Sequence, residues 1–266
     1  MIAERCQRWR GGRGRYRPAG EVIVPSRHEV SEISSDEVAR AFVERHHYSR
    51  SFPAARRRFG LYERGELVGV AVLSHPMHDQ VTASVFPGVP RLDAAELGRF
   101  VLLDRVAGNG ESWFLARVWE LLAGELAGVV MYSDPVARQD SQGRSVMPGH
   151  VGVIYQATNA TYLGRGRGGA VYVLPDGSVF SRRTAQKISG GERGFRPAMD
   201  LLVRHGAPEP GFDLSSVPLR KEWLKVALAA CSRKVMHPGN HKYAWGIDRR
   251  VRRRLPESLP YPRAPS

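Results

Sequence analysis

A glycine-containing turn between a predicted strand and a predicted helix is the first candidate for chemistry. Its sequence is Arg105-Val106-Ala107-Gly108-Asn109-Gly110. Glycines at such a turn let backbone N–H groups point outward together, and the N-terminus of the following helix adds partial positive charge. A pyrophosphate would fit there, with Arg105, Gly108, Asn109 and Gly110 as its binding residues. An ordinary left-handed turn without a ligand is the alternative for so short a pattern.

Tyr155 is the second candidate, because it lies in a short helix predicted from His150 to Thr158. A tyrosine hydroxyl at that place could act as a general acid. An aromatic side chain that only packs on the sheet is the alternative. The turn and this helix resemble those of the GNAT acetyltransferases, where the turn holds the pyrophosphate of coenzyme A and the tyrosine faces the reacting thioester or leaving sulfur. The resemblance implies acetyl-CoA as the cofactor.

Six short motifs in one order resemble the phage Mom DNA-modification family, from about residue 40 to residue 247. The resemblance implies a GNAT-like fold and modification of adenine at its exocyclic N6 in phage DNA, which protects that DNA from host restriction nucleases. The motifs are His46-His47-Tyr48-Ser49, Glu96-Leu97-Gly98-Arg99, Glu111-Ser112-Trp113-Phe114-Leu115, Tyr132-Ser133-Asp134-Pro135, Gly149-His150-Val151-Gly152-Val153-Ile154-Tyr155-Gln156-Ala157 and His241-Lys242-Tyr243.

The resemblance places the family's functional positions on six residues of this chain. Asp134 follows a predicted buried strand and could accept the proton of an exocyclic amine or orient a water, or it could cap the turn before Pro135. Arg99 lies on an otherwise apolar strand, so burial without a partner would be costly. It would meet a carboxylate such as Glu96 or Asp134, or face a ligand phosphate. The six are His47, Tyr48, Arg99, Ser112, Asp134 and Tyr155.

His47 and Ser112 each keep several possible roles. His47 could be a base, a metal ligand or a DNA contact, or a solvated histidine at a helix end. Ser112, in the first turn of its helix, either caps free N–H groups or meets a cofactor phosphate. His75, His78 and His150 show no metal-ligand spacing, so no metal ligands are predicted, and the sequence leaves open whether iron or another metal takes part.

The elements that position these residues predict an α/β or α+β three-layer fold. We expect a GNAT-like mixed, mostly antiparallel central sheet flanked by helices, with a C-terminal insertion. A hairpin turns at Arg64-Gly65, and Ser34 with Glu37 forms a capping box for a helix that turns Val38, Phe42 and Val43 inward. A short strand at Val22 to Val24 and a polar loop from Ser133 to Pro148 are also predicted.

The expected organisation has three parts. Residues 1–20 form a basic arginine- and glycine-rich arm without apolar periodicity, and residues 21–248 form a single GNAT-like domain with an insertion at about 181–236. Residues 249–266 form a basic, proline-rich tail. The two cysteines are too few for a disulfide framework, and the N-terminus lacks an apolar signal core. We therefore expect a location in the host-cell cytoplasm and no membrane partner.

The charge balance predicts a polyanionic partner. Lys and Arg number 40 against 26 Asp and Glu, a formal net charge of +14. Arginine forks match phosphate oxygens and stack on bases. Tyr48, Trp113 and Tyr162 are candidates for stacking on a base that has left its helix. The expected phosphate contacts are Arg13, Arg15, Arg17, Arg165, Arg167, Arg249, Arg250, Arg252 and Arg253.

These observations predict a phage DNA-modifying transferase. It would transfer a small acyl-derived group from an acyl-CoA to an exocyclic amine of the phage genome, adenine N6. One alternative is a CoA-dependent N-acetyltransferase acting on an amino-modified pyrimidine in DNA, a tRNA or a protein. Another is a nucleic-acid-binding protein without catalysis. The sequence does not indicate the added group, the target context or the oligomeric state.

Overall fold

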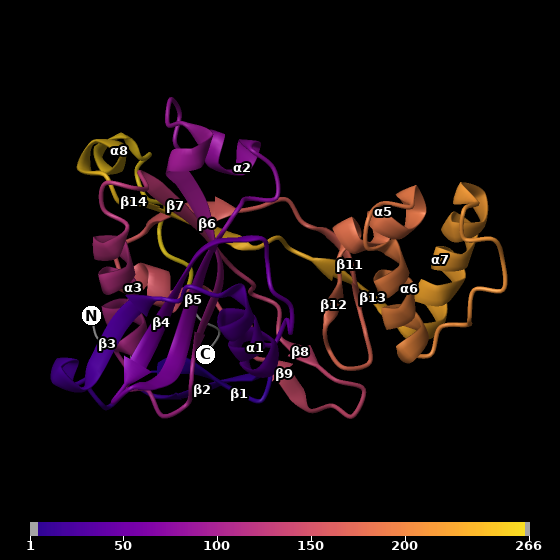
Figure 1. The fold of residues 1–266 in the computed structure, drawn as a ribbon, viewed down its shortest axis with the longest axis horizontal. Helices are drawn as coiled ribbons and strands as arrows, with labels where there is room; N and C mark the ends of the chain where they lie inside the picture. The colour runs from indigo at the N-terminus through magenta and orange to yellow at the C-terminus, as the bar shows by residue number, and fades with distance from the viewer. Residues whose placement is uncertain (1–4, 264–266) are drawn as a thin grey trace. The chain divides into compact units, whose positions relative to one another are not determined.

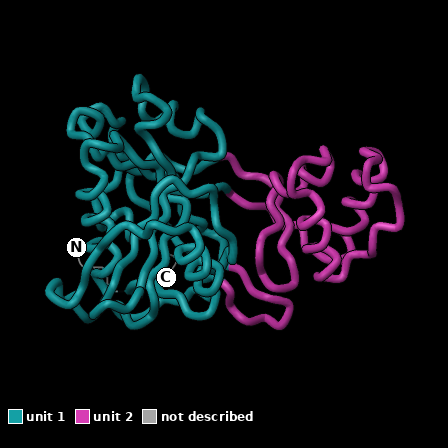
Figure 2. Tube along the Cα trace, in the orientation of Figure 1, with its two compact units in different colours: residues 1–137, 147–166, 239–266 teal, residues 138–146, 167–238 magenta. Residues whose placement is uncertain are grey.

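Residues 5–263 are described by a computed structural model, and they belong to two units with separate cores (Figure 2). Unit 1 comprises residues 1–137, 147–166 and 239–266, and unit 2 comprises residues 138–146 and 167–238. Within residues 5–263, none of the helices combines the length and the apolar composition that crossing a membrane requires.

A seven-stranded sheet forms the centre of unit 1, in the order β10-β14-β7-β6-β5-β4-β3 (Figure 1). Its strands are β3 (His28–Glu32), β4 (Ala55–Glu63), β5 (Glu66–Ser74), β6 (Ala94–Leu102), β7 (Gly128–Ser133), β10 (Thr161–Arg165) and β14 (His241–Gly246). Neighbours are antiparallel except β6 and β7, which pair in parallel from Ala94 to Glu96. Both strands continue beyond this paired stretch. The expected GNAT-like mixed, mostly antiparallel sheet flanked by helices is confirmed.

Helices cover both faces of this sheet (Figure 1). On one face, α3 (Gly110–Leu121) and α4 (Val153–Ala157) pack on a core that includes Phe114, Met131 and Tyr243. On the other face lies α1 (Asp36–His46) over Val70, Val72 and Val101. Side chains alternate along a strand, so neighbours such as Val101 and Leu102 serve opposite cores. Four further short helices belong to the unit: α2 (Gln80–Ala83), α8 (Arg249–Arg254) and the 3-10 helices Pro25–Arg27 and Arg91–Asp93.

Local predictions in unit 1 differ from the structure in two places. The cap of α1 is Ser35, whose hydroxyl accepts the Glu37 amide at 3.0 Å, one residue later than expected. Val38 is consequently 48% exposed, and Ala39 and Val43 are the buried positions. Residues 22–24 form no strand, because the Ile23 amide donates to the Asn109 side chain at 2.7 Å instead of to a strand neighbour. The hairpin turn at Arg64-Gly65 is present as predicted.

Residues expected to form a basic arm instead form a β-hairpin. Its strands are β1 (Arg5–Arg10) and β2 (Arg13–Pro18), paired antiparallel. Cys6 and Trp9 are buried, Arg8 is 0% exposed, and Trp9 forms a parallel bridge with Leu103 at the end of β6. The hairpin is held by polar partners for its arginines as well as by apolar burial. An apolar pattern alone therefore could not reveal it.

Unit 2 has its own sheet and helical layer. The sheet order is β12 (Val179–Phe180), β11 (Gly169–Val173), β13 (Arg233–His237), with the predicted turn at Asp176-Gly177. Its core includes Ile188, Leu202, Trp223 and Leu228. The unit takes in the expected insertion and extends beyond both ends of it. Its helices are α5 (Arg182–Gly190), α6 (Phe195–Arg204) and α7 (Val217–Cys231). The expected polar loop from Ser133 to Pro148 contains two short paired strands, β8 (Arg138–Gln139) and β9 (Ser145–Met147).

Candidate active site

An aromatic stack lies at the C-terminal end of α1. The Trp9 ring stacks on His47 and Tyr48 at 5.0 and 5.1 Å between centroids, and the His47 and Tyr48 rings are 4.2 Å apart. The Ser49 amide donates to Nδ1 of His47 at 3.1 Å. A neutral His47 therefore carries its proton on Nε2, so that atom is a donor. This geometry favours a positioning or contact role for His47 over that of a base.

The Arg99 side chain extends from β6 to Ser51, in the segment that follows this stack. Its Nε donates to the Ser51 carbonyl at 2.9 Å and its Nη2 to the Ser51 hydroxyl at 2.8 Å. Burial lowers the pKa of Arg99, while Tyr48 and Glu96 act in the opposite direction. The Arg99 guanidinium thus contacts Ser51 atoms, and the Glu96 carboxylate acts on it through its charge. The choice between a carboxylate partner and a ligand phosphate stays a prediction.

Glu96 lies three residues before Arg99 and is a half-buried acid of this region. Burial raises the pKa of its carboxyl, and Arg99 partly offsets that rise. Sequence reasoning named Glu96 only as a partner for Arg99. A carboxyl whose pKa lies above its usual range is a candidate for proton transfer near neutral pH.

Tyr155 of α4 is 4% exposed, and its hydroxyl donates to the Tyr132 carbonyl at 3.3 Å. Burial raises its pKa strongly, and the neighbouring Tyr48, Tyr243 and Glu96 raise it further. Burial likewise raises the pKa of Tyr132 to about 12. Tyr155 is therefore protonated at neutral pH and can donate a proton. We call Tyr48, Glu96, Arg99 and Tyr155 the β6–α4 cluster.

The other two predicted residues, Ser112 and Asp134, lie outside β6 and α4. The Asp134 carboxylate accepts the Val136 amide at 2.9 Å, and its carbonyl accepts the His150 amide at 2.8 Å. This is the turn-capping alternative. The Ser112 hydroxyl donates to the Asn109 carbonyl at 3.1 Å and lines a pocket of about 260 Å³ together with His150.

The glycine-containing turn is engaged by its own chain. The Gly108 amide donates to the Glu21 carbonyl at 3.0 Å, and the Gly110 amide donates within the turn to Ala107 at 2.9 Å. The Ala19 carbonyl lies so close to Gly108 that a Cβ there would be 2.2 Å from it. Arg105 pairs with Glu66 at 2.7 Å. In this arrangement the turn does not fit a diphosphate.

The buried side chain of Arg8, on β1, contacts the same turn. Its guanidinium donates to the Val106 carbonyl at 3.0 Å, to the Ala107 carbonyl and to the Glu111 carboxylate. Burial raises the pKa of Glu111, and the Arg8 charge opposes that rise. No pattern in the sequence pointed to this buried ion pair, because both partners look like surface residues.

The sequence predicted no role for two further buried polar residues, Ser133 and His241. They are register partners on β7 and β14, and both are 1% exposed. Ser133 Oγ and His241 Nε2 have no hydrogen-bond partner, while His241 Nδ1 lies 2.7 Å from the Tyr162 hydroxyl. Burial lowers the pKa of His241, so its ring is neutral at pH 7. Both residues belong to motifs quoted above, but their proximity follows only from the strand pairing.

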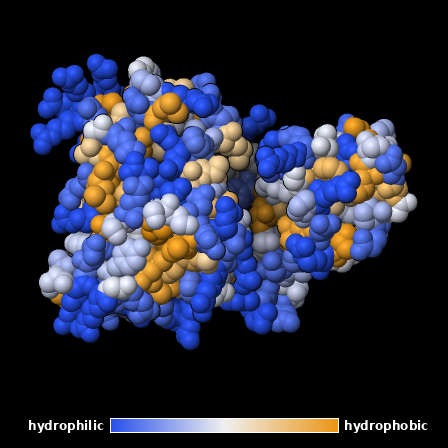
Figure 3. All heavy atoms as spheres, in the orientation of Figure 1, coloured by the Kyte–Doolittle hydropathy of each residue, from blue (hydrophilic) through white to orange (hydrophobic). Residues whose placement is uncertain are grey.

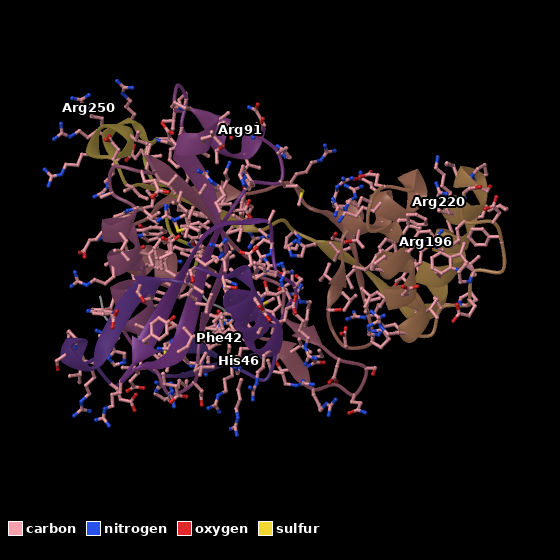
Figure 4. All side chains as sticks on the ribbon, in the orientation of Figure 1. Phe42, His46, Arg91, Arg196, Arg220 and Arg250 are labelled. Atoms are coloured by element: carbon pink, nitrogen blue, oxygen red, sulfur yellow. The ribbon has the colours of Figure 1, made fainter. Side chains whose placement is uncertain are left out.

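The arginines expected to contact nucleic acid differ in their surroundings. Arg15 pairs with Asp104, and Arg17 donates to the Val106 carbonyl at 2.7 Å and to Glu21 at 3.1 Å. Arg13 is half-buried, and Arg165 and Arg167 are exposed. The C-terminal arginines lie on α8 (Arg249–Arg254), capped by Asp248. Hydrophilic residues cover this helix (Figure 3), and Arg250 points into solvent (Figure 4).

In the part of the chain that the structure describes, no three His, Cys, Asp or Glu side chains gather in an arrangement that could hold a metal ion.

Comparisons with known proteins give one family. The Mom protein family profile matches residues 27–196, which contain the whole β6–α4 cluster. No curated protein matches the sequence. A tandem GNAT protein from the clavulanic acid biosynthesis pathway, solved without acetyl-CoA, is similar in structure with a TM-score of 0.41 at 11% identity, over 83% of this chain and 99% of that one. A candidate acetyltransferase from Pyrococcus horikoshii gives a TM-score of 0.35 at 11% identity, over 85% and 92%. The fold assignment rests on the strand order and pairing.

Proposed function

The chain belongs to the Mom protein family, and on that premise we propose that it modifies DNA by transferring a small acyl-derived group to the exocyclic N6 of adenine. The observation that carries the proposal is the β6–α4 cluster within the matched residues. It joins a carboxyl of raised pKa, a half-buried arginine and a protonated tyrosine. The net charge of +14 supports a DNA substrate.

The amine must first leave the base pair, because duplex pairing buries it. Tyr48 is half-buried and already stacked on Trp9, so its ring offers a platform for the extruded adenine. Arg99 is held by Ser51 and would contact the electron-rich edge of the base or the carbonyl of the incoming group. These contacts would bring the amine beside Glu96.

Glu96 would accept the proton that the amine loses as its nitrogen bonds to the acyl carbon. Tyr155 would donate its hydroxyl hydrogen towards the oxygen or the leaving group as the bond between acyl group and carrier breaks. The fold class suggests an acyl-CoA as the carrier. Residues 19–21 would have to withdraw from Gly108 before a diphosphate could use the turn amides.

The test is expression in a bacterium, digestion of its DNA to nucleosides and mass spectrometry. The proposal predicts a new nucleoside with the wild-type protein and its loss with Tyr155→Phe. Tyr62→Phe on β4 is the matched control and should retain the product. An unaltered nucleoside profile with soluble wild-type protein would overturn the proposal and favour a binding protein without catalysis.

A further inference from the structure

A groove within unit 2 has the features of a nucleic-acid site and lies outside the predicted contacts. It is an open depression of about 660 Å³ between α5, α7 and the sheet. Four cations line it, namely Arg182, Lys221, Lys225 and Lys234. We call it the lysine groove, because it holds three of the five lysines in a chain whose other cations are arginines.

The local fold explains why these lysines gather. Lys221 and Lys225 are one helical turn apart on α7, which begins at its Ser216 cap. Leu224 and Leu228 lie between and beyond them and are each 7% exposed, so they form an apolar floor. Lys234 on β13 is the register partner of Tyr172 on β11, which places the two side chains on one face of the sheet.

The charges of the groove are available to a ligand. All four cations are exposed, and no carboxylate lines the groove. Lys225 pairs with Glu222 at 2.8 Å on the helix surface, an exposed contact of little stability. A buried arginine of this unit, by contrast, is already engaged by the protein. Arg220, labelled in Figure 4, donates to the Ile188 carbonyl at 2.8 Å and is 3% exposed.

We propose that the lysine groove binds a single-stranded segment of DNA. An aromatic ring beside an apolar floor, bordered by cations, suits unpaired bases whose backbone follows the positive rim. Bases in a duplex are stacked and paired, so they cannot reach Tyr172 and the leucine floor. The inference rests on the proposed function for the identity of the partner.

The three lysines of the groove lie outside the residues that the family profile matches, whereas Tyr172 and Arg182 lie within them. The family match ends at residue 196, whereas Lys221, Lys225 and Lys234 all follow it. Lys and Arg also outnumber Asp and Glu in unit 2. DNA held there would increase the time that the protein spends near its substrate, independently of the β6–α4 cluster.

The test compares two triple variants of the full chain that lose equal charge. The groove variant is Lys221→Gln with Lys225→Gln and Lys234→Gln. The control is Arg193→Gln with Arg196→Gln and Arg204→Gln, all exposed in unit 2 and outside the groove. Binding of a fluorescent single-stranded oligonucleotide is followed by anisotropy over a salt series, with circular dichroism to confirm folding.

We expect the groove variant to lose affinity by roughly tenfold or more near 0.1 M salt and its logarithmic salt slope to fall by about 2. The control should change little. Tyr172→Leu should weaken binding by about fivefold to a hundredfold without altering the slope, because stacking carries no counterion release. Equal losses in both triple variants, or equally tight groove-dependent binding of a polyglutamate peptide, would overturn the inference.

Nucleoside analysis separates this inference from the proposed function. Groove-dependent binding in a protein that modifies no nucleoside would uphold the groove and refute the transferase. If the wild-type protein modifies a nucleoside but the groove variant binds DNA as tightly as the wild type, the transferase is upheld and the groove is refuted.

Discussion

The arginines of the N-terminal hairpin and those of α8 are similar in sequence but differ in structure. Arg8 is fully buried against Glu111 and the carbonyls of the 105–110 turn, and Arg15 and Arg17 pair with acids of unit 1. Arg249, Arg250 and Arg253 are exposed on a short helix. Basic clusters therefore cannot be assigned to DNA by composition. In the first cluster Arg8 and Arg17 stabilise the fold, whereas these three arginines of the second remain available to a polyanion.

The largest expected effect is the loss of the Arg8 side chain. Arg8→Gln leaves Glu111 buried with its charge uncompensated, so the free energy of unfolding should fall by about 3–5 kcal/mol. Urea denaturation measures it. Arg8→Met combined with Glu111→Leu should recover most of that loss, because no buried charge remains. Arg15→Gln, at an exposed pair, serves as the control and should leave stability unchanged. If Arg8→Gln lowers the free energy of unfolding no more than Arg15→Gln does, the proposed difference between the two arginine clusters is wrong.

Replacing the α8 arginines should change DNA binding and leave the stability of the fold unchanged. Replacing Arg249, Arg250 and Arg253 by glutamine should reduce the logarithmic salt slope for duplex DNA by about 2 to 3 and leave the urea midpoint in place. The same measurements on Arg15→Gln should show an unchanged slope. A lowered midpoint in the α8 variant, or an unaltered slope, would contradict the assignment of this helix to DNA.

A smaller effect concerns the pH dependence of stability at Glu96. Because burial raises its folded-state pKa, the folded protein binds this proton more readily than the unfolded chain. The contribution of Glu96 to the free energy of unfolding is fully present below the pKa that its carboxyl has in the unfolded chain. It is lost as the pH rises through the higher pKa of the folded state. Glu96→Gln should therefore exceed the wild type in stability at pH 8, with the difference shrinking towards pH 4. A difference that is independent of pH, measured by urea denaturation, would exclude the raised pKa.

Much of the fold could be predicted, since the turn at Arg64-Gly65, the strand of Glu96 and the helix of Tyr155 follow local patterns. The partners of buried polar groups could not. Arg8 with Glu111, and Ser133 with His241, are joined by contacts between distant segments that no spacing encodes. The glycine-containing turn shows most clearly what local sequence patterns cannot predict. Its residues suit a phosphate, yet the Gly108 amide donates to Glu21 and the Gly110 amide to Ala107 of the turn itself.

The most direct test locates the added mass on the DNA. Nucleosides from cells expressing the wild-type protein are fragmented by mass spectrometry after labelling adenine with ¹⁵N at its exocyclic amine. The account predicts a new deoxyadenosine derivative whose added mass stays with the base and retains the label. Unmodified deoxyadenosine, or added mass on a pyrimidine or the sugar, would contradict it.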